Sequence, residues 1–284
     1  MEVLERDNLE QWLGEMRPRV HRFCGRIMGS AIDGEDVTQE ALARAAAAFE
    51  QSAPIVRPDA WLFRIAHNAA IDMLRQRQPY VPLIDDDNRA DPTSGSDVRV
   101  EVRLGFAAFL PLPPPQRASV VLIDVLGYSL AETAAILETS VAAVKATLHR
   151  GRNRLAANDA PPAPRIDPRE RLQLEAYADL FNARAFDALR DLLAADVRLD
   201  LPRRRRLEGK EQVGTYFTHY RDAPYRWHLR PVLADGRLAL LATDPTGAES
   251  RFLIVLAWSG GRIATIQDFY FARYVMDEIH IAEM

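Results

Sequence analysis

Basic side chains gather in residues 139–158, a segment that contains no acid. They are Lys145, His149, Arg150, Arg152 and Arg154. The apolar residues of the segment recur at helical spacing, so the basic residues lie mostly on the other face of the expected helix. Such a helix suits the major groove of DNA, where cations neutralise phosphates and polar side chains reach base edges. The segment therefore predicts a local contact with nucleic acid.

Two short helices joined by a tight turn, within residues 127–155, would position these side chains. Ser129 and Glu132 form a capping box that starts the first helix, and Ser140 is a suitable N-cap for the second. Glu138 occupies the turn position that often holds glycine, where left-handed geometry costs about 1–2 kcal/mol. The residues expected to face inward from the second helix are Val141, Val144, Leu148 and Leu155. A solvated helix pair in an ordinary bundle is the alternative interpretation.

The chain as a whole is not a uniformly basic nucleic-acid binder. Its 284 residues carry a net charge of −4 and are 48% hydrophobic, enough for two or three domains with their own cores. Any DNA contact is therefore expected to be local. Cys24 is the only cysteine, so we expect no intrachain disulfide and no cysteine-based metal site. We also expect no cofactor. Because no signal-peptide pattern and no apolar run of about 20 residues is found, we expect a cytoplasmic protein.

Composition divides the chain into three blocks and two linkers. Residues 8–77 and residues 101–157 predict two all-α domains, the second of which contains the helix pair. Residues 78–100 hold five aspartates and two arginines among prolines and serines, a composition typical of a flexible acidic linker. Residues 158–167 form a proline-rich linker to the last block, residues 168–284.

The last block changes from helical to strand-like patterns. Residues 168–195 predict two helices, and Asp235-Gly236 and Gly260-Gly261 predict hairpin turns between the strands that follow. The strand-like runs are residues 197–201, 226–234, 237–243, 251–258 and 263–271. Helices first and antiparallel strands later predict an α+β domain with helices packed on one face of a sheet.

An acidic and polar helix face is expected near the N-terminus. Asp36, Gln39 and Glu40 fall at positions i, i+3 and i+4 and share one face, while Val37 and Arg44 occupy other faces. Such a face can dock a basic helical partner. A plain solvated helix face is the alternative.

Residues 58–77 combine aromatic and polar side chains on one expected helix. Trp61 and Phe63 add aromatic surface near its start, and Arg64, Asn68 and Arg75 lie near one another on a polar face. Aromatic rings beside arginines suit unpaired bases, which stack on the rings while the cations hold the phosphates. For either aromatic residue alone, a position in the core is the alternative.

The order of these segments resembles the extracytoplasmic-function (ECF) sigma factors over residues 8–157. The sequence DVTQE precedes AWLFRIAHNAAIDMLR, and the acidic linker and the helix pair follow. The resemblance implies that residues 8–77 are sigma region two and residues 101–157 are sigma region four. It also implies that the protein is not an enzyme, that its partners are the bacterial RNA polymerase core and promoter DNA, and that the acidic linker threads toward the polymerase channels.

The resemblance also implies roles for single positions. Asp36, Gln39 and Glu40 would contact the coiled-coil helices of the largest polymerase subunit. The residues implied to contact the promoter −10 element are Trp61, Arg64, Asn68 and Arg75. The residues implied to contact the −35 element are Ser140, Lys145, His149, Arg150 and Arg152.

Residues 168–284 resemble a SnoaL-like domain, an α+β cone around a pocket, in the segments LEAYADLFNARAFDAL, LLAADVRLDL and QDFY. The resemblance implies a regulatory domain whose possible pocket residues are His228, Asp268 and Tyr270, with Asp200 as a further candidate. A small-molecule ligand is favoured over catalysis, so no catalytic residue is predicted, and a purely protein-contacting role is the remaining alternative. The four arginines at 203–206 predict a loop that is either solvated or contacts the acidic linker or DNA.

These patterns together predict a sigma factor that directs promoter recognition, with a C-terminal domain that modulates its activity. Two other classes remain open. One is a one-component, ligand-responsive helix-turn-helix regulator without a polymerase contact, which the acidic face around Asp36 argues against. The other is a SnoaL-like isomerase or hydrolase with a regulatory fusion, for which His228 and Asp268 are the acid–base candidates.

Overall fold

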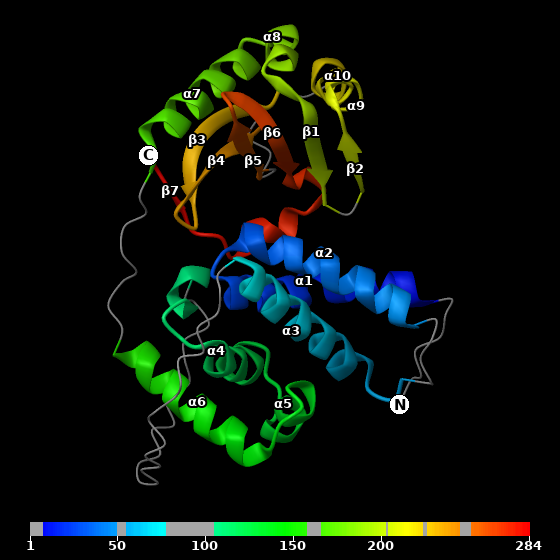
Figure 1. The fold of residues 1–284 in the computed structure, drawn as a ribbon, viewed down its shortest axis with the longest axis vertical. Helices are drawn as coiled ribbons and strands as arrows, with labels where there is room; N and C mark the ends of the chain where they lie inside the picture. Colours follow the sequence, from blue (N-terminus) through cyan, green and yellow to red (C-terminus); the bar gives the residue numbers. More distant parts are fainter. Residues whose placement is uncertain are drawn as a thin grey trace. The chain divides into compact units, whose positions relative to one another are not determined.

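The computed structural model describes residues 8–49, 55–77, 105–157, 166–202, 204–223, 226–244 and 251–284 (Figure 1). The chain divides into two compact units, residues 1–161 and residues 162–284. The expected acidic linker and most of the expected proline-rich linker lie outside the described residues. None of the described helices is both long and apolar enough to cross a membrane.

Three long helices begin the first unit, in the block that the sequence predicts to be helical. They are α1 (Leu9–Met28), α2 (Ala31–Phe49) and α3 (Pro58–Arg77). Glycine allows α1 and α2 to cross closely, because a Cβ atom at Gly34 would lie 2.5 Å from the Cα atom of Gly25. Gly29 ends α1 with a φ of 78°, a left-handed conformation that favours glycine. Phe23, Val37 and other buried apolar residues of the three helices form a shared core.

The second half of this unit is built from short helices. A 3₁₀ turn (Phe106–Phe109) precedes α4 (Pro114–Val120), which continues as a π-helical turn (Val121–Val125). The helix pair follows as α5 (Leu130–Ile136) and α6 (Val141–Ala156). Pro114 stands in the first turn of α4, where proline costs no hydrogen bond.

Arg117 of α4 joins the two helical halves of this unit. Its buried guanidinium donates hydrogen bonds to the carbonyl oxygen of Ile27 at the end of α1 and to those of Leu110 (2.9 Å) and Leu112 (2.8 Å). The last carbonyl groups of a helix lack partners within the helix, so this contact satisfies one of them. Burial lowers the pKa of Arg117 to about 10. Apolar side chains from both halves also pack together in one hydrophobic core.

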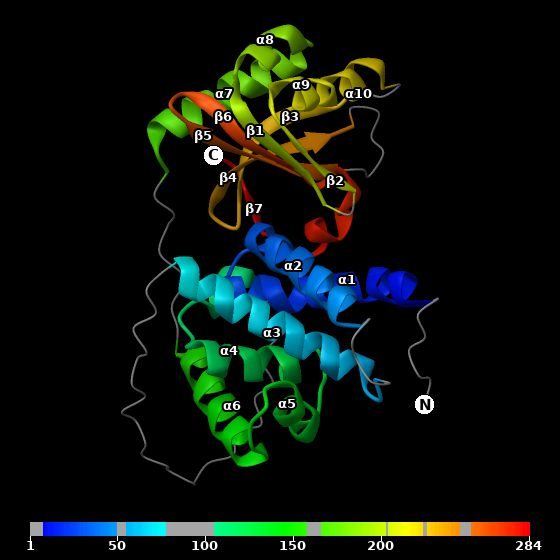
Figure 2. The same ribbon diagram turned by 45° about the vertical axis from the view of Figure 1, so that its right-hand side comes forward.

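The second unit is an α+β domain, as predicted. Helices α7 (Pro168–Asn182) and α8 (Phe186–Asp191) come first, and α9 (Lys210–Gly214) and α10 (Tyr216–Asp222) interrupt the strands. The strands are β1 (Leu193–Leu201), β2 (Arg205–Glu208), β3 (His228–Ala234), β4 (Arg237–Thr243), β5 (Arg251–Ser259), β6 (Arg262–Asp268) and β7 (Ile281–Ala282). Their order in the sheet is β2-β1-β6-β5-β4-β3-β7. Figure 2 shows the helices gathered on one face of this curved sheet.

Several details of this domain correct the sequence predictions. The sheet is mixed, because β1 pairs with β6 in parallel, whereas all strands were expected to be antiparallel. Strands β2 and β7 were missed since both are short. Arg205 and Arg206 belong to β2 rather than to a loop, because they pair with Leu201 and Asp200 of β1. The predicted hairpin turns are confirmed, with Asp235 and Gly236 at φ values of 48° and 78°.

Candidate nucleic-acid interface and C-terminal pocket

The helix pair has the caps that the sequence predicts. The hydroxyl oxygen of Ser129 accepts a hydrogen bond from the backbone N–H of Glu132 (3.2 Å), and Glu132 accepts one from the N–H of Ser129 (2.9 Å). Ser140 accepts a hydrogen bond from the N–H of Ala143 (3.1 Å) and so caps α6. Glu138 has a φ of 51°, which confirms the left-handed turn. These contacts fix where α6 begins and which face it exposes.

The apolar face of α6 packs on α4. Val144 and Leu148 are buried, and Gly151 allows close approach, since a Cβ atom there would lie 2.7 Å from Val120. Val141 is 41% exposed, so its expected inward position is wrong. It is the first residue of the helix and precedes the contact with α4, which begins at Val144.

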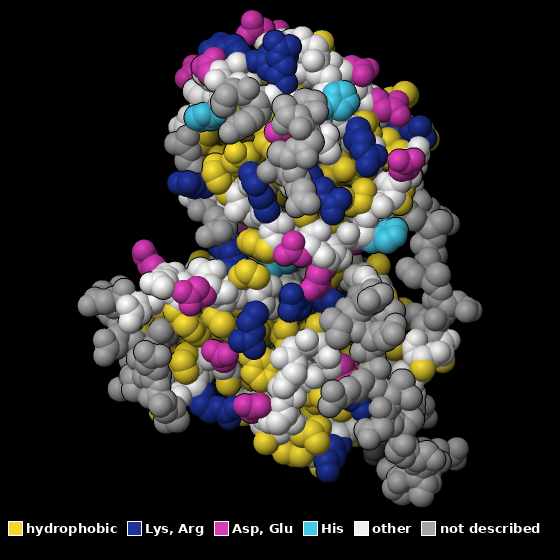
Figure 3. Space-filling view, turned by 180° about the vertical axis from the view of Figure 1, so that it is seen from behind, with side chains coloured by type: hydrophobic (Ala, Val, Ile, Leu, Met, Phe, Trp, Pro, Cys, Tyr) yellow, Lys and Arg dark blue, Asp and Glu magenta, His cyan; other side chains and the backbone are white. Residues whose placement is uncertain are grey.

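The basic face of α6 is narrower than the sequence pattern indicates. Lys145 and His149 are exposed, and Arg150 is half-buried. Arg152 makes two hydrogen bonds of 2.9 and 2.6 Å to the carboxylate of Asp124, whose side chain is 1% exposed. Arg152 therefore ties α6 to the π-helical turn, and its part in the predicted DNA contact is reduced. On the face drawn in Figure 3, basic and acidic side chains are interspersed rather than collected in one patch.

The acidic face on α2 is present, with one correction. Asp36 is half-buried, and Gln39 and Glu40 are exposed. Arg44, expected on another face, lies beside Glu40 and donates hydrogen bonds to it (2.7 Å) and to Asp72 of α3 (2.8 Å). Because residues four apart in a helix are neighbours, the spacing of Glu40 and Arg44 already contained this contact.

The aromatic residues of α3 differ in position. Phe63 is fully buried and packs edge-on against Phe23, so it belongs to the core. Trp61 is half-buried and contacts Phe49, which leaves part of its ring accessible. Asn68 is exposed. The remaining basic residues proposed for DNA contact, Arg64 and Arg75, lie on the side of α3 that faces the helix pair.

A cavity of about 620 Å³ opens inside the second unit. It is lined by Leu201, Arg204, Tyr216, His219, Tyr220, Ala223, Trp227, Asp268, Tyr270 and Phe271. Two of the predicted pocket residues, Asp268 and Tyr270, are brought together here. His228 is exposed and does not line this cavity, and Asp200 instead pairs with Arg206. The histidine at the cavity is His219, on α10, which sequence reasoning missed.

Asp268 is the polar centre of this cavity. Its Oδ2 atom accepts hydrogen bonds from the hydroxyl groups of Tyr216 (2.7 Å) and Tyr220, and its Oδ1 atom accepts one from the N–H of Tyr270 (2.8 Å). The two tyrosines are four residues apart on α10, so the sequence already indicated that their side chains lie on one face of that helix. The hydroxyl of Tyr177, also buried, has no hydrogen-bond partner in the described part of the chain.

Burial dominates the electrostatics of this cluster. It raises the pKa of Asp268, and the hydrogen bonds from Tyr220 and Tyr216 oppose that rise. Burial, followed by the charge of Asp268, raises the pKa of both tyrosines well above the ordinary value. Among the described residues, no group of three or more His, Cys, Asp or Glu side chains is placed to hold a metal ion.

Replacing Asp268 with asparagine is expected to change how stability depends on pH. Because the pKa of Asp268 is raised in the folded chain, the folded state binds this proton more tightly than the unfolded state does. The resulting stabilisation is complete below the ordinary aspartate pKa and is lost as pH rises through the raised value. Over that range the free energy of unfolding falls by up to about 1.4 kcal/mol per pH unit. The Tm of the wild type should therefore fall relative to that of Asp268→Asn as pH rises above the ordinary aspartate pKa.

The matched control is Asp187→Asn, at a side chain that is 95% exposed in the same unit. Its Tm should follow that of the wild type at every pH. Parallel curves for the wild type and Asp268→Asn would contradict the assigned environment of Asp268.

Comparison with known proteins places both units in described families. The family profile for Sigma-70 region 2 matches residues 13–80, that for Sigma-70 region 4 matches residues 108–155, and that for the SnoaL-like domain matches residues 174–276. The ECF RNA polymerase sigma factor SigM of Mycobacterium tuberculosis is 35% identical over 143 residues, which cover 49% of this chain and 70% of SigM. The chain belongs to the ECF RNA polymerase sigma factors.

Two further relatives extend the comparison. The ECF sigma factor SigG of M. tuberculosis is 34% identical over 211 residues, which are 63% of this chain and 57% of SigG. The crystal structure of the ECF sigma factor SigJ from the same species aligns with 91% of this chain and 95% of its own, at 20% identity and a TM-score of 0.37. In this ECF sigma factor, the region 2 match falls on α1 to α3 and the region 4 match includes α4 to α6.

Proposed function

We propose that this ECF sigma factor binds the RNA polymerase core and directs it to promoters. The proposed polymerase contacts are Asp36, Gln39 and Glu40. Two of these side chains are exposed, and the apolar residues Val37 and Ala41 hold the helix in the core beneath them. A negatively charged face anchored in this way is complementary to a basic helical partner.

The capped helix α6, which buries one face and exposes a basic one, carries the proposal that the protein reads DNA. Lys145 and His149 are the most accessible basic side chains of the proposed −35 contact, and Ser140 and Arg150 flank them. Arg152 remains in the proposed set as a residue that positions α6 through Asp124. A −35 element would be contacted through its phosphates by Lys145 and through base edges by the neighbouring polar groups.

The proposed −10 contact lies on α3. The part of the Trp61 ring that remains accessible could stack on an unpaired base, while Arg64, Asn68 and Arg75 supply polar and charged contacts. Phe63 is left out of this set, because its ring is fully buried.

For the SnoaL-like domain, we propose that the cavity at Asp268 binds a small molecule and that the domain modulates transcription. Its walls combine aromatic rings with a few polar groups, as in many ligand sites. Both oxygens of Asp268 already accept hydrogen bonds, which disfavours this carboxylate as a general base. SnoaL-like domains include enzymes, and the arrangement in this chain favours binding.

Run-off transcription with purified bacterial core polymerase tests the proposal. The full chain is expected to bind core polymerase and to select a defined start site on promoter templates. If it binds promoter-like DNA without associating with core polymerase, the one-component regulator replaces the sigma factor as the better hypothesis.

Deleting residues 168–284 is expected to change promoter output by several-fold while binding to core polymerase survives. The reason is that the first unit has its own core and retains all of the proposed polymerase and DNA contacts. Pull-down by core polymerase serves as the control that the shortened chain is folded. Unaltered run-off yield from the shortened chain would contradict a regulatory role for the SnoaL-like domain.

A further inference from the structure

Asp268 is a buried acid beside which the described residues place no cation. It lines the cavity of about 620 Å³ in the second unit and is 1% exposed. In the part of the chain that the structure describes, its oxygen atoms accept hydrogen bonds from neutral groups only, the hydroxyls of Tyr216 and Tyr220 and the N–H of Tyr270. Buried charges in proteins are usually paired. Burial raises the pKa of Asp268, and no described cation offsets that rise.

The polar wall around Asp268 offers acceptors rather than donors. A tyrosine hydroxyl has a single hydrogen, and those of Tyr216 and Tyr220 are both directed to Asp268. The oxygen atoms of these hydroxyls keep lone pairs, and a carboxylate that accepts three hydrogen bonds keeps about one further acceptor site. A ligand group that donates hydrogen bonds therefore fits this wall. A carbonyl or carboxylate oxygen finds no free donor on these three side chains.

Aromatic rings line much of the rest of the cavity. Trp227 and Tyr270 pack edge-on with 5.9 Å between their ring centres, and Phe271 packs edge-on against Tyr270 at 5.0 Å. The faces of such rings attract cations. Two of them already do so within this chain, because Arg204 lies 4.7 Å from the centre of Phe271 and Arg273 lies 5.2 Å from that of Tyr270. The walls therefore suit an organic cation.

The basic side chains at this cavity do not cancel the charge of Asp268. Those that line it in the described part of the chain are Arg204 and His219, and both are exposed. Water and salt screen exposed charges, whereas a buried charge such as that of Asp268 is screened much less. The attraction of a cation inside the cavity therefore exceeds its repulsion at the exposed edge.

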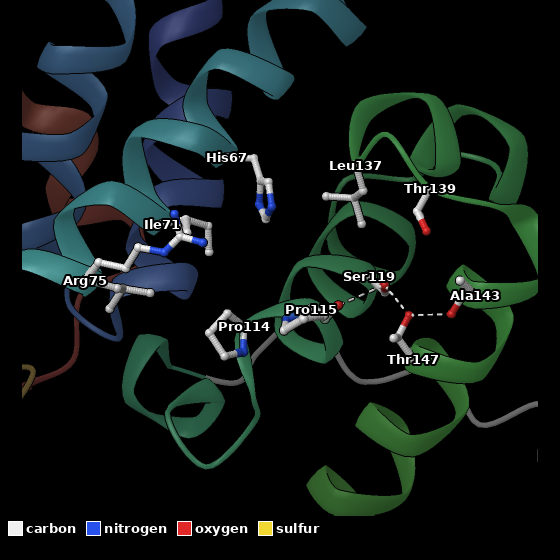
Figure 4. Close-up of a pocket in the computed structure, with 11 residues that line it drawn as sticks. His67, Ile71, Arg75, Pro114, Pro115, Ser119, Leu137, Thr139, Ala143 and Thr147 are labelled. Carbon is white, nitrogen blue, oxygen red and sulfur yellow. Dashed lines mark hydrogen bonds between the residues drawn. The ribbon is translucent and has the colours of Figure 1, made fainter. Parts of the chain in front are cut away.

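A cavity in the first unit lacks these features. It has a volume of about 330 Å³ and lies between α3, α4 and α6 (Figure 4). His67 and Arg75 line it, and none of its described lining residues is an acid. The hydroxyls of Ser119 and Thr147 at its wall hydrogen-bond to each other at 2.7 Å. A cation would find no counter-ion there, so the case for a charged ligand applies to the cavity at Asp268.

We propose that the cavity at Asp268 takes a protonated organic amine, whose ammonium group pairs with Asp268 and whose apolar body lies against Trp227 and Tyr270. This inference rests on the proposed function, because it names the chemical class of the small molecule assigned to this cavity. The ammonium group supplies the missing counter-ion and donates hydrogen bonds to the carboxylate and to the tyrosine oxygens. Pairing a buried charge in this way favours the bound state over the empty one.

Calorimetric titration of the full-length chain with matched probes tests the ligand class. Tryptamine, phenethylamine and naphthylethylamine are each compared with the alcohol and the carboxylic acid of the same framework, which differ from the amine only in the polar end group. At least one amine is expected to bind about tenfold or more tightly than its own alcohol, with the acid weaker still. If no amine binds more tightly than its alcohol, the proposal is overturned. This comparison uses the wild type alone and does not depend on the folding of any variant.

Asp268→Asn separates the loss of charge from the loss of the cavity. Affinity for the amine should fall by about tenfold or more, while affinity for the alcohol should stay within about twofold and so report an intact cavity. The matched control is Asp187→Asn, at an exposed side chain of the same unit, which should change neither affinity. A second variant, Trp227→Leu, should weaken binding of the amine more than that of the alcohol. Equal weakening of amine and alcohol by Asp268→Asn would refute Asp268 as the counter-ion.

The remaining outcomes distinguish the ligand class from the proposed function. If alcohols or acids bind and amines do not, the cavity still binds a small molecule and the amine class alone is wrong. If none of the probes binds, the amine class and the ligand role of the cavity fail together. The bound amine is expected to change run-off yield several-fold with the wild type and not with Asp268→Asn. Amine binding without any change in run-off yield would keep the site and refute its regulatory role.

Discussion

Replacing Arg152 with alanine is expected to destabilise the first unit by about 3–5 kcal/mol, because the carboxylate of Asp124 would remain buried without its charged partner. A loss of this size corresponds to a fall in Tm of roughly 10 °C or more. Thermal unfolding followed by circular dichroism measures it. The double variant Asp124→Leu, Arg152→Met should recover much of the loss, since apolar side chains of similar size can replace a buried ion pair.

Lys145→Ala is the matched control on the same helix. Lys145 is exposed, so Tm should stay within about 1–2 °C of the wild type, while affinity for −35 DNA falls and the salt dependence of binding weakens. If Arg152→Ala lowers DNA affinity without lowering Tm, Arg152 contacts DNA directly and its assignment as a positioning residue is wrong.

Reversing the charge of Asp36 is expected to weaken the association with core polymerase enough to abolish pull-down. Asp36→Arg places a cation on the face that is proposed to meet a basic helical partner, and like charges across an interface cost several kcal/mol. The affinity for core polymerase should fall by about thirty-fold or more, which corresponds to about 2 kcal/mol. Titration of labelled chain with core polymerase measures this loss.

Glu15→Arg makes the same change of charge at an exposed position on α1 and should leave the affinity unchanged. Both variants should keep the helical content and the Tm of the wild type within a few degrees. Equal binding of Asp36→Arg and Glu15→Arg to core polymerase would remove the acidic face from the proposed interface and would favour the one-component regulator.

Local signals in the sequence were sufficient to predict the helices and the caps. The capping box at Ser129 and Glu132, the N-cap at Ser140 and the left-handed turn at Glu138 depend on residues within a few positions of each other. The hairpin at Asp235-Gly236 is local in the same sense. Such features follow from backbone preferences that each short segment carries by itself.

The pairings between distant segments depended on the tertiary structure. The sequence places Arg152 among the basic residues of one helix, but only the fold brings Asp124 beneath it. His228, which the sequence analysis proposed, does not line the cavity. His219 does, because α10 contacts Asp268 through Tyr216 and Tyr220. The parallel pairing of β1 and β6 likewise joins segments far apart in the chain.

The sequence by itself therefore determined the order of the domains, the helix caps and the family to which the chain belongs, because these are written in short motifs and their spacing. Only the tertiary structure decided which charged side chains are accessible and which are already paired. The contact of Arg64 with Glu138 is the clearest case, since neither residue predicts the other. The physical reason is that burial and ion pairing are set by neighbours in space, and the chain folds to bring those neighbours together.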